Sequence, residues 1–340
     1  RSVRNTKGEY EMSRYIAKRL LILVPVIICV AFTIFTIMHF APGDPVSIIL
    51  GDKYTPEQYA EVQRKLGLDQ PYVIQLFRFL KQTFIDFDFG TSFIDNSNVM
   101  EELLARLPRT AIIAAVCCVV QIVVAIPLGI IAAVHQGGLW DRLCILIAMF
   151  AISLPNFWFA MILILIFSLH INLLPSYGVD HWYSYILPCA ANSLMGVGGM
   201  ARLSRSQMLE VLRADYVVTA KAKGVSKLKV LYSHALPNAL IPIVTNVGTY
   251  FGTALAGTVV IETVFSIPGI GYYMKDAIGN RDYPVVLGGV TFLAVLFCMV
   301  ILVVDLVYAF IDPRIKAQYE EAGSKKKKIN KNRGEVEVNG

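Results

Sequence analysis

The sequence predicts an all-α membrane protein with six transmembrane helices and a small helical extracellular insert after the first of them. Of its 340 residues, 56% are hydrophobic and 16% are charged, and the mean hydropathy is +0.57. Soluble domains carry about 25% charged residues, so the chain lacks the charge that a fully hydrated surface needs. Several apolar runs also reach the ~20 residues that cross a bilayer core as a helix.

The first apolar run follows basic residues and has no small-residue cleavage site after it, which favours a membrane anchor over a signal peptide. Residues 1–11 before it are polar and aperiodic, and we expect them to be an N-terminal extension that precedes Met12. The fourth run has the weakest signal because it is rich in small and polar residues. The predicted spans are residues 15–40, 110–134, 139–169, 185–203, 239–264 and 285–310.

Lysine and arginine in short loops predict the orientation, because these residues concentrate on the cytoplasmic side. Residues 201–237 hold seven basic and two acidic residues, whereas residues 41–105 hold five basic and ten acidic ones. Residues 170–183 contain no lysine or arginine. We therefore expect both termini in the cytoplasm and residues 41–105 outside. Opposite charge on different loops indicates sidedness and not nucleic acid binding.

The outer segment after the first span is predicted to be helical, so residues 12–105 comprise the first transmembrane helix and an extracellular insert. Thr55 has the character of an N-cap, with Pro56 at the first helical position and Gln58 at the capping-box position, and Gly67 is expected to end that helix. A second helix should follow and pack on the membrane domain as a cap, with direct substrate contact as the alternative. Its apolar residues at helical spacing are Val73, Leu76, Phe77, Leu80 and Phe84.

No pattern of a catalytic or metal site appears in the chain. It lacks the phosphate-binding loop G-x-x-x-x-G-K-[ST] and the hydrolase patterns H-E-x-x-H and G-x-S-x-G. Its six cysteines all fall in apolar segments, where they serve as small apolar side chains, and its five histidines are scattered. One acid, Asp305, lies within the last span; we expect a structural partner or an interface position for it, and a functional intramembrane acid is the alternative.

The basic segment between the fourth and fifth spans is organised. Residues 215–223, "DYVVTAKAK", predict a short helix with Asp215 at its start, where the helix dipole favours an acid. Gly224 should end this helix, and Leu236 and Pro237 stand where the next span begins. A short helix held between two spans on the cytoplasmic face can transmit movement between a partner and the membrane helices.

This segment resembles the loop by which the membrane subunits of bacterial binding-protein-dependent ABC importers dock on their ATPase, with the pattern E-A-A-x-x-x-G-x9-I-x-L-P. Ala220, Gly224, Leu236 and Pro237 match it, whereas Val218, Thr219 and His234 replace its glutamate, first alanine and isoleucine. The chain looks like the first-permease subunit of the oligopeptide/dipeptide group over nearly all of residues 12–317. The stretches that carry this resemblance are "HFAPGDPV", "LGLDQPY", "DFDFGTSF", "LPSYG", "VIETVFSIPGIGYYMKDAIGNRDYPVV" and "FIDPR".

The resemblance implies a type I ABC importer permease fold in the bacterial plasma membrane, with the transmembrane domain in residues 106–317. The composition of residues 318–340 predicts a solvated, disordered basic tail, with contact of Lys325 to Lys328 with anionic lipid as the alternative. The resemblance also implies a homologous second permease, two ABC ATPase subunits, an extracellular substrate-binding lipoprotein and a peptide substrate as partners. This chain would bind no cofactor, because ATP and Mg are used by the ATPase subunits. Import of a nickel chelate or an oligosaccharide on the same scaffold, a free-standing secondary carrier and a membrane-embedded enzyme are the alternatives.

Three groups of candidate site residues follow. Polar residues in the fourth and fifth spans could line a wet translocation path, with helix packing as the alternative for each: Asn192, Ser193, Asn246, Thr249 and Thr253. The apolar segment "FSIPGIG" cannot be regular helix throughout, so it and its flanks are an outer gate or binding-protein contact, or else an ordinary outer loop: Glu262, Phe265, Pro268, Gly269, Arg281 and Asp282. The ATPase-coupling residues are Asp215, Thr219, Ala220, Lys221, Ala222, Gly224, Leu236 and Pro237.

Overall fold

The structure, a computed structural model, describes residues 2–51 and 53–311, without the side chains of residues 2–16, 18, 256, 257 and 308–311. Within these residues the regular elements are all helices, and one isolated bridge joins Thr91 and Asn98. The predicted basic tail, residues 318–340, lies outside the described residues. The prediction of an all-α protein is confirmed over the part that the structure covers.

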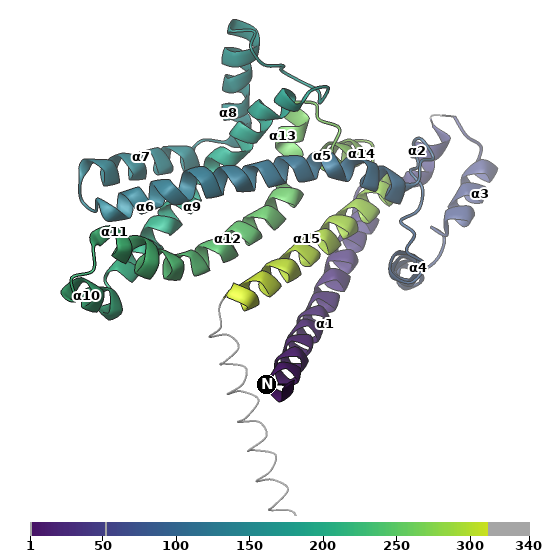
Figure 1. The fold of residues 1–340 in the computed structure, drawn as a ribbon. Coiled ribbons are helices and arrows are strands. Elements are labelled where there is room, and N and C mark those ends of the chain that lie inside the picture. Colours follow the sequence, from purple (N-terminus) through teal and green to yellow (C-terminus); the bar gives the residue numbers. More distant parts are fainter. Residues whose placement is uncertain (1, 52, 312–340) are drawn as a thin grey trace, which may run out of the picture.

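The long helices form one helical body, with short helices at its two ends (Figure 1). In chain order, the body begins with α1 (Ser2–Phe40), then α5 (Val99–Val120) continued by η1 (Gln121–Ala125) and α6 (Ile126–Val134), and then α7 (Leu139–Ser153) and α8 (Asn156–Leu163) continued by η2 (Ile164–His170). It goes on with η3 (Trp182–Tyr185) and α9 (Ile186–Leu212), α12 (Leu236–Gly257), the shorter helices α13 (Val259–Val264) and α14 (Ile270–Gly279), and α15 (Tyr283–Ile311). The insert contains α2 (Pro45–Leu50), α3 (Pro56–Leu66) and α4 (Tyr72–Phe84), and the basic loop contains α10 (Asp215–Ala222), α11 (Lys227–Lys229) and η4 (Val230–Ala235).

Helix α9 is the central packing element, in contact with α5, α6, α7, α8 and α12. Its neighbours approach closely because glycine stands at the contacts. A Cβ atom added at Gly198 would lie 2.5 Å from the carbonyl oxygen of Ala148, and one at Gly129 would lie 2.5 Å from that of Ala201. Small residues at such contacts let membrane helices pack through dispersion forces where the hydrophobic effect between helices is absent.

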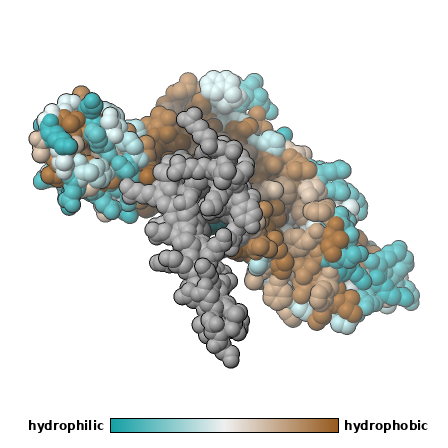
Figure 2. All heavy atoms as spheres, turned by 60° about the horizontal axis from the view of Figure 1, so that its bottom comes forward, coloured by the Kyte–Doolittle hydropathy of each residue, from teal (hydrophilic) through white to brown (hydrophobic). Residues whose placement is uncertain are grey.

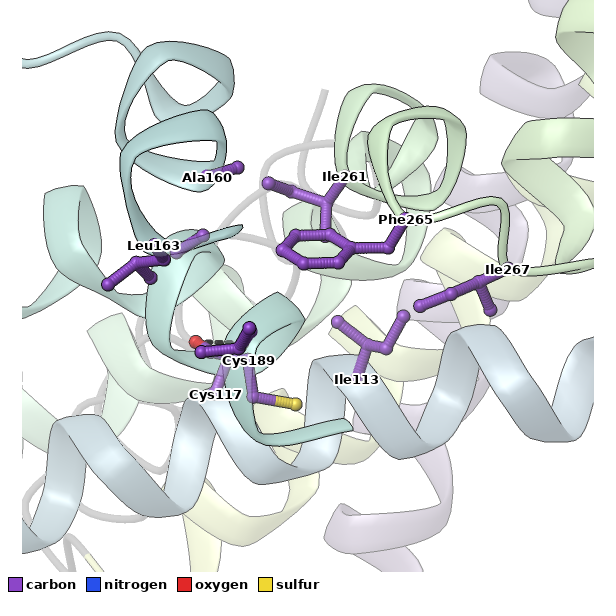
Figure 3. Close-up of a cluster of buried hydrophobic side chains, with 10 residues drawn as sticks. Ile113, Cys117, Ala160, Leu163, Cys189, Ile261, Phe265 and Ile267 are labelled. Atoms are coloured by element: carbon purple, nitrogen blue, oxygen red, sulfur yellow. Dashed lines mark hydrogen bonds between the residues drawn. The ribbon is translucent and has the colours of Figure 1, made fainter. Parts of the chain in front are cut away.

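A buried apolar cluster joins helices that are far apart in the sequence (Figure 3). Ile113 and Cys117 of α5 lie against Leu163 of α8 and against Phe265 and Ile267 of the loop after α13. The loop "FSIPGIG" is therefore held against the helices by its own apolar side chains. Within a membrane, irregular backbone survives only where it is buried against protein or faces water.

The apolar surface lies between two polar ends. Figure 2 shows hydrophilic residues at opposite ends of the molecule, with a hydrophobic zone between them. Three helices are long and apolar enough to cross a membrane, residues Arg19–Phe40, Val99–Val134 and Tyr283–Val307, and α7 with α8 forms a fourth candidate if a bent pair is one span. Helices α9 and α12 do not meet the same test over the described residues. The count of six spans therefore stays a prediction.

The third predicted span, residues 139–169, is broken and not one straight helix. Its two halves, Leu139–Ser153 and Asn156–His170, meet at an angle of 99°. Pro155 stands at the break, where its ring removes a backbone donor and prevents the helix of α7 from continuing. As a result α8 points away from the layer that contains α5, α6 and α7 (Figure 1).

The insert begins as the sequence predicts. Thr55 and Gln58 form a reciprocal capping box at the start of α3, and Gly67 ends this helix in the left-handed conformation with φ 68°. The expected packing face of α4 is partly buried: Leu76, Leu80 and Phe84 are half-buried, whereas Val73 and Phe77 are exposed. Phe79 stacks on Phe35 of α1, the Tyr72 ring packs against Phe35 at a tilt, and the hydroxyl groups of Tyr72 and Thr36 lie 2.7 Å apart. Helix α1 therefore contacts two aromatic residues of α4, Tyr72 and Phe79, that do not belong to the predicted apolar stripe.

The first and last membrane helices pack against each other. Arg19 of α1 lies 3.0 Å from Asp305 of α15, and the Asp305 side chain is largely buried. This pairing gives Asp305 the structural partner that was expected for it. Residues 2–11, expected to be an aperiodic extension, continue α1 as helix.

Candidate functional site

A cavity of about 410 Å³ lies where η1, α8, α9 and α12 meet. Its polar lining consists of amide, hydroxyl and phenol groups, and none of the described lining residues is charged. The lining residues are Gln121, Asn156, Asn192, Met195, Gly196, Gly199, Met200, Leu203, Asn246, Tyr250, Thr253 and Ala254. An uncharged polar cavity between membrane helices can hydrate or hydrogen-bond a solute without attracting one sign of charge.

Three of the five predicted path residues, Asn192, Asn246 and Thr253, line this cavity. The other two do not. Ser193 is buried and donates to the carbonyl oxygen of Cys189 at 2.6 Å, and Thr249 donates to that of Thr245 at 3.0 Å, so both hydroxyl groups are satisfied within their own helices. The assignment of any of them to a path stays a prediction.

Gln121 is a lining residue that the sequence analysis missed. It is fully buried and its side-chain amide makes no well-aligned hydrogen bond over the described residues, although the phenol of Tyr250 lies beside it. Leaving a buried polar group unsatisfied costs about 1–3 kcal/mol, so most such groups find partners. The signal was present as a single amide within the apolar run "CCVVQIVVAIP".

The outer loop is tied to α5 by a buried carboxylate. Glu262 is fully buried, and its Oε1 accepts hydrogen bonds from the hydroxyl groups of Thr110 and Thr258, each at 2.7 Å. Its Oε2 accepts from the backbone amide of Tyr272 at 2.9 Å, and the amide of Ile270 donates to Thr110 at 2.9 Å. The carboxylate therefore joins α5, α13 and the first turn of α14 in one network.

A second buried carboxylate attaches the insert to the last helix. Asp282 accepts from the hydroxyl of Ser92 at 2.6 Å and from the amide of Phe93 at 3.1 Å. Among the predicted gate residues, Glu262, Phe265, Gly269 and Asp282 are buried, Pro268 is half-buried, and Arg281 is exposed. Of these six residues, Arg281 alone is largely exposed, so in this conformation the buried members can act only by holding the loop. Their gate or contact role stays a prediction.

The basic loop forms the short helix α10, and Gly224 follows it with φ 77°. The amide of Val225 donates to the carbonyl of Ala220 at 3.2 Å, which closes the helix end. Asp215, Thr219, Lys221 and Ala222 are exposed, Ala220 is half-buried, and Leu236 and Pro237 begin α12.

Apolar side chains are also exposed on this loop, a feature that the sequence analysis did not use. Tyr216 is 46%, Leu228 69% and Tyr232 61% exposed. Val217 points the other way and is fully buried, which fixes α10 against its own chain. A loop that is fixed on one side and exposes apolar side chains on the other has the character of a docking surface.

The helix that precedes α10 is clamped to the turn between α6 and α7. Arg205 of α9 donates two hydrogen bonds to the carboxylate of Asp141, at 2.6 and 2.9 Å, and Asp141 also accepts from the amide of Gly137 at 2.8 Å. Two turns farther along, Arg213 donates to the side-chain oxygen of Gln136 at 3.3 Å. Planar, two-point pairing of arginine with a carboxylate restricts the geometry more than a single ion pair does.

Over the described residues, no group of three or more histidine, cysteine, aspartate and glutamate side chains is placed to hold a metal ion. The cysteines are all free, and four of them are buried.

The chain matches two family models. Residues 125–317 match the binding-protein-dependent transport system inner membrane component, and residues 12–114 match the N-terminal part of binding-protein-dependent transport system membrane components. The chain is 38% identical to the dipeptide transport system permease protein DppB of Alkalihalophilus pseudofirmus, over 90% of this chain and 100% of that protein. It is 39% identical to the glutathione transport system permease protein GsiC of Salmonella paratyphi A, over 90% of this chain and 99% of that protein.

Among solved structures, the fold is similar to the methionine ABC transporter MetNI in its inward-facing conformations. Two crystal forms give TM-scores of 0.53 and 0.54 at 16% and 17% identity, over 63% of this chain and 97% of the matched chain. At this identity the similarity concerns the fold alone, which is that of type I importer permeases. The sequence matches extend over nearly the whole chain, and they show that it belongs to the family of binding-protein-dependent transport system inner membrane components.

Proposed function

We propose that the chain is one of the two pore-forming permease subunits of an ATP-driven importer of peptides in the bacterial plasma membrane. The observation that carries the proposal is its identity of 38–39%, over nearly their full length, to permease subunits named for dipeptide and glutathione transport. The chain is a transport subunit and not an enzyme, and ATP hydrolysis belongs to separate ATPase subunits.

The proposed assembly contains a second, homologous permease, two ATPase subunits that use ATP and Mg, and an extracellular substrate-binding protein. The exposed apolar residues of the basic loop support ATPase docking there, since Tyr216 lies in α10, Leu228 and Tyr232 lie in the helices that follow it, and all three are exposed. Movement of α10 would pass to α9, which continues into it through a short turn, and then through Asp141 and Arg205 to the turn before α7. A permease of this kind needs only two conformations whose balance is set by ATP bound in its partners.

The cavity between η1, α8, α9 and α12 supports a path for an uncharged or zwitterionic solute, because its described lining carries amides and hydroxyls and no charge. A nickel chelate or an oligosaccharide is not favoured, since the two relatives described above are named for dipeptide and glutathione transport. A free-standing carrier would function without ATPase subunits, which provides a direct test.

The test is uptake into proteoliposomes. The chain is reconstituted with its second permease, both ATPases and the binding protein, and uptake of a labelled dipeptide and a labelled tripeptide is measured. We expect uptake that requires external binding protein and internal ATP and stops when the ATPase subunits carry a hydrolysis-blocking substitution. Uptake that persists with the ATPases omitted would establish a secondary carrier instead, and a complex that transports an oligosaccharide but no peptide would refute the substrate class.

A further inference from the structure

We propose that the cavity binds the backbone of a passing peptide through uncharged amide side chains, with Gln121 as its central contact. This inference rests on the proposed function and specifies which part of the substrate this chain recognises. It assigns to Gln121 a binding role that explains why a fully buried amide makes no well-aligned hydrogen bond over the described residues.

The first step is the state of Gln121 itself. Both its side-chain oxygen and its side-chain nitrogen are buried, neither makes a well-aligned hydrogen bond in the described structure, and the residue lines the cavity. A buried amide with neither group satisfied destabilises the fold, so its presence calls for an explanation in function or in a bound molecule. In this conformation the amide is covered and lies beside Tyr250, so it can complete its hydrogen bonds with a solute only when the Tyr250 or Gln121 side chain moves aside.

The second step is that neighbouring residues make room for this amide. Gly196 of α9 stands beside it, and an added Cβ atom there would lie 2.2 Å from the side-chain nitrogen of Gln121 and 2.7 Å from the ring of Tyr250. Tyr250 is positioned in turn by its hydroxyl, which donates to the carbonyl oxygen of Asn192 at 3.1 Å. Gln121 also begins a π-helical turn within a long helix, a distortion that is common at functional sites.

The third step is a second unsatisfied amide on another element. Asn156 begins α8 directly after the 99° bend, lines the same cavity, and has a buried side-chain oxygen without a partner. Broken helices that carry binding groups at mid-membrane depth are a recurring feature of transporters. Gln121 and Asn156 therefore approach the cavity from two different helices, and both present unused amide groups.

The fourth step is the chemistry of the ligand. A carboxamide offers one acceptor and two donors, which complement the C=O and N–H of a peptide group irrespective of the neighbouring side chains. The described lining contains no charge that would select acidic or basic peptides, and about 410 Å³ is within the range of small-ligand sites. A few neutral hydrogen bonds also hold a solute weakly, and weak holding allows release on the other side.

The test compares the Gln121→Leu variant with the parent in the complete complex, using labelled trialanine and two analogues with central lysine or glutamate. We expect uptake at saturating binding protein to fall roughly fivefold, as for the loss of about one hydrogen bond, and to fall by the same factor for all three peptides. The thermal unfolding temperature of the complex should stay equal or rise, because leucine removes an unsatisfied buried amide. Gln207→Leu is the matched control, the same change on α9 at a residue that does not line the cavity, and should leave uptake near the parent value.

The outcomes separate this inference from the proposed function. A parent complex that imports none of the three peptides contradicts the proposed function. A parent that imports all three and a Gln121→Leu variant that matches it contradict only the inference. A fall confined to one charged peptide, or a fall accompanied by a lower unfolding temperature, would also overturn it, since the first indicates side-chain selection and the second a structural role.

Discussion

Glu262 is a fully buried carboxylate whose two oxygens accept three hydrogen bonds. Thr110, one of its donors, is 152 residues away in the sequence. Gly269 provides the space for this arrangement, because an added Cβ atom would lie 2.5 Å from the carboxyl carbon of Glu262. The glycine is needed for close approach, and not for an unusual backbone conformation, since its φ is −95°.

At the residue scale, we predict that Gly269→Ala lowers the thermal unfolding temperature of the complex. The added methyl must displace a carboxylate that three hydrogen bonds hold in place, and overpacking of this kind costs about 1–3 kcal/mol. Gly279→Ala is the control, since nothing lies within 4 Å of the added atom there. The effect should shrink in a Glu262→Ala background; an equal loss in both backgrounds would show that the clash lies elsewhere.

Helix α10 shows how one element can be fixed and exposed at once. Val217 is buried against the chain, whereas Tyr216 beside it is 46% exposed. The half-buried Ala220 lies three residues after Val217, on the side that faces the chain itself. The exposed side of this helix, and not Ala220, is therefore the place to probe a docking partner without disturbing the fold.

At the element scale, we predict that Tyr216→Asp leaves the chain inserted at the parent level but lowers retention of the ATPase subunits on purification and lowers uptake at least tenfold. A charge buried at the interface without a partner costs several kcal/mol. Tyr54→Asp provides the comparison, because Tyr54 is similarly exposed, at 41%, but belongs to the insert at the opposite end. Full ATPase retention in the Tyr216→Asp complex would mean that α10 does not dock.

At the scale of the whole molecule, the insert and the basic loop lie at opposite polar ends, and the surface between these ends is apolar (Figures 1 and 2). The acidic balance of residues 41–105 and the basic balance of residues 201–237 agree with this separation. If the apolar zone lies in the bilayer, these two ends face opposite compartments.

We therefore predict opposite accessibility for two exposed positions, Asp180 in the loop before α9 and Lys227 in α11. Single cysteines are placed there in a background in which the six native cysteines are replaced. A membrane-impermeant maleimide should label Asp180→Cys in sealed cells and Lys227→Cys only in inverted vesicles. Labelling of both positions from the same side would refute the predicted topology, including the cytoplasmic position of the basic loop.

Features set by short-range physics could be read from the sequence alone. The capping box of Thr55 and Gln58, the left-handed glycine at the end of α3, the helix α10 and its end before Gly224 all depend on neighbours within a few residues. The apolar segments and the balance of charge between loops depend on composition, and they predict a helical membrane protein for the same reason.

Features set by contact between distant segments were decided only by the tertiary structure. Helix α4 places Tyr72 and Phe79 against Phe35 of α1 and leaves Val73 and Phe77 of its apolar stripe exposed, because the position of α1 decides which side of α4 is covered. The sequence suggested Ser193 as a path residue and passed over Gln121, since whether a polar group is satisfied depends on what the neighbouring helices offer it. Residue type determined which groups can hydrogen-bond; the packing of α9 against η1, α8 and α12 decided which of them face the cavity.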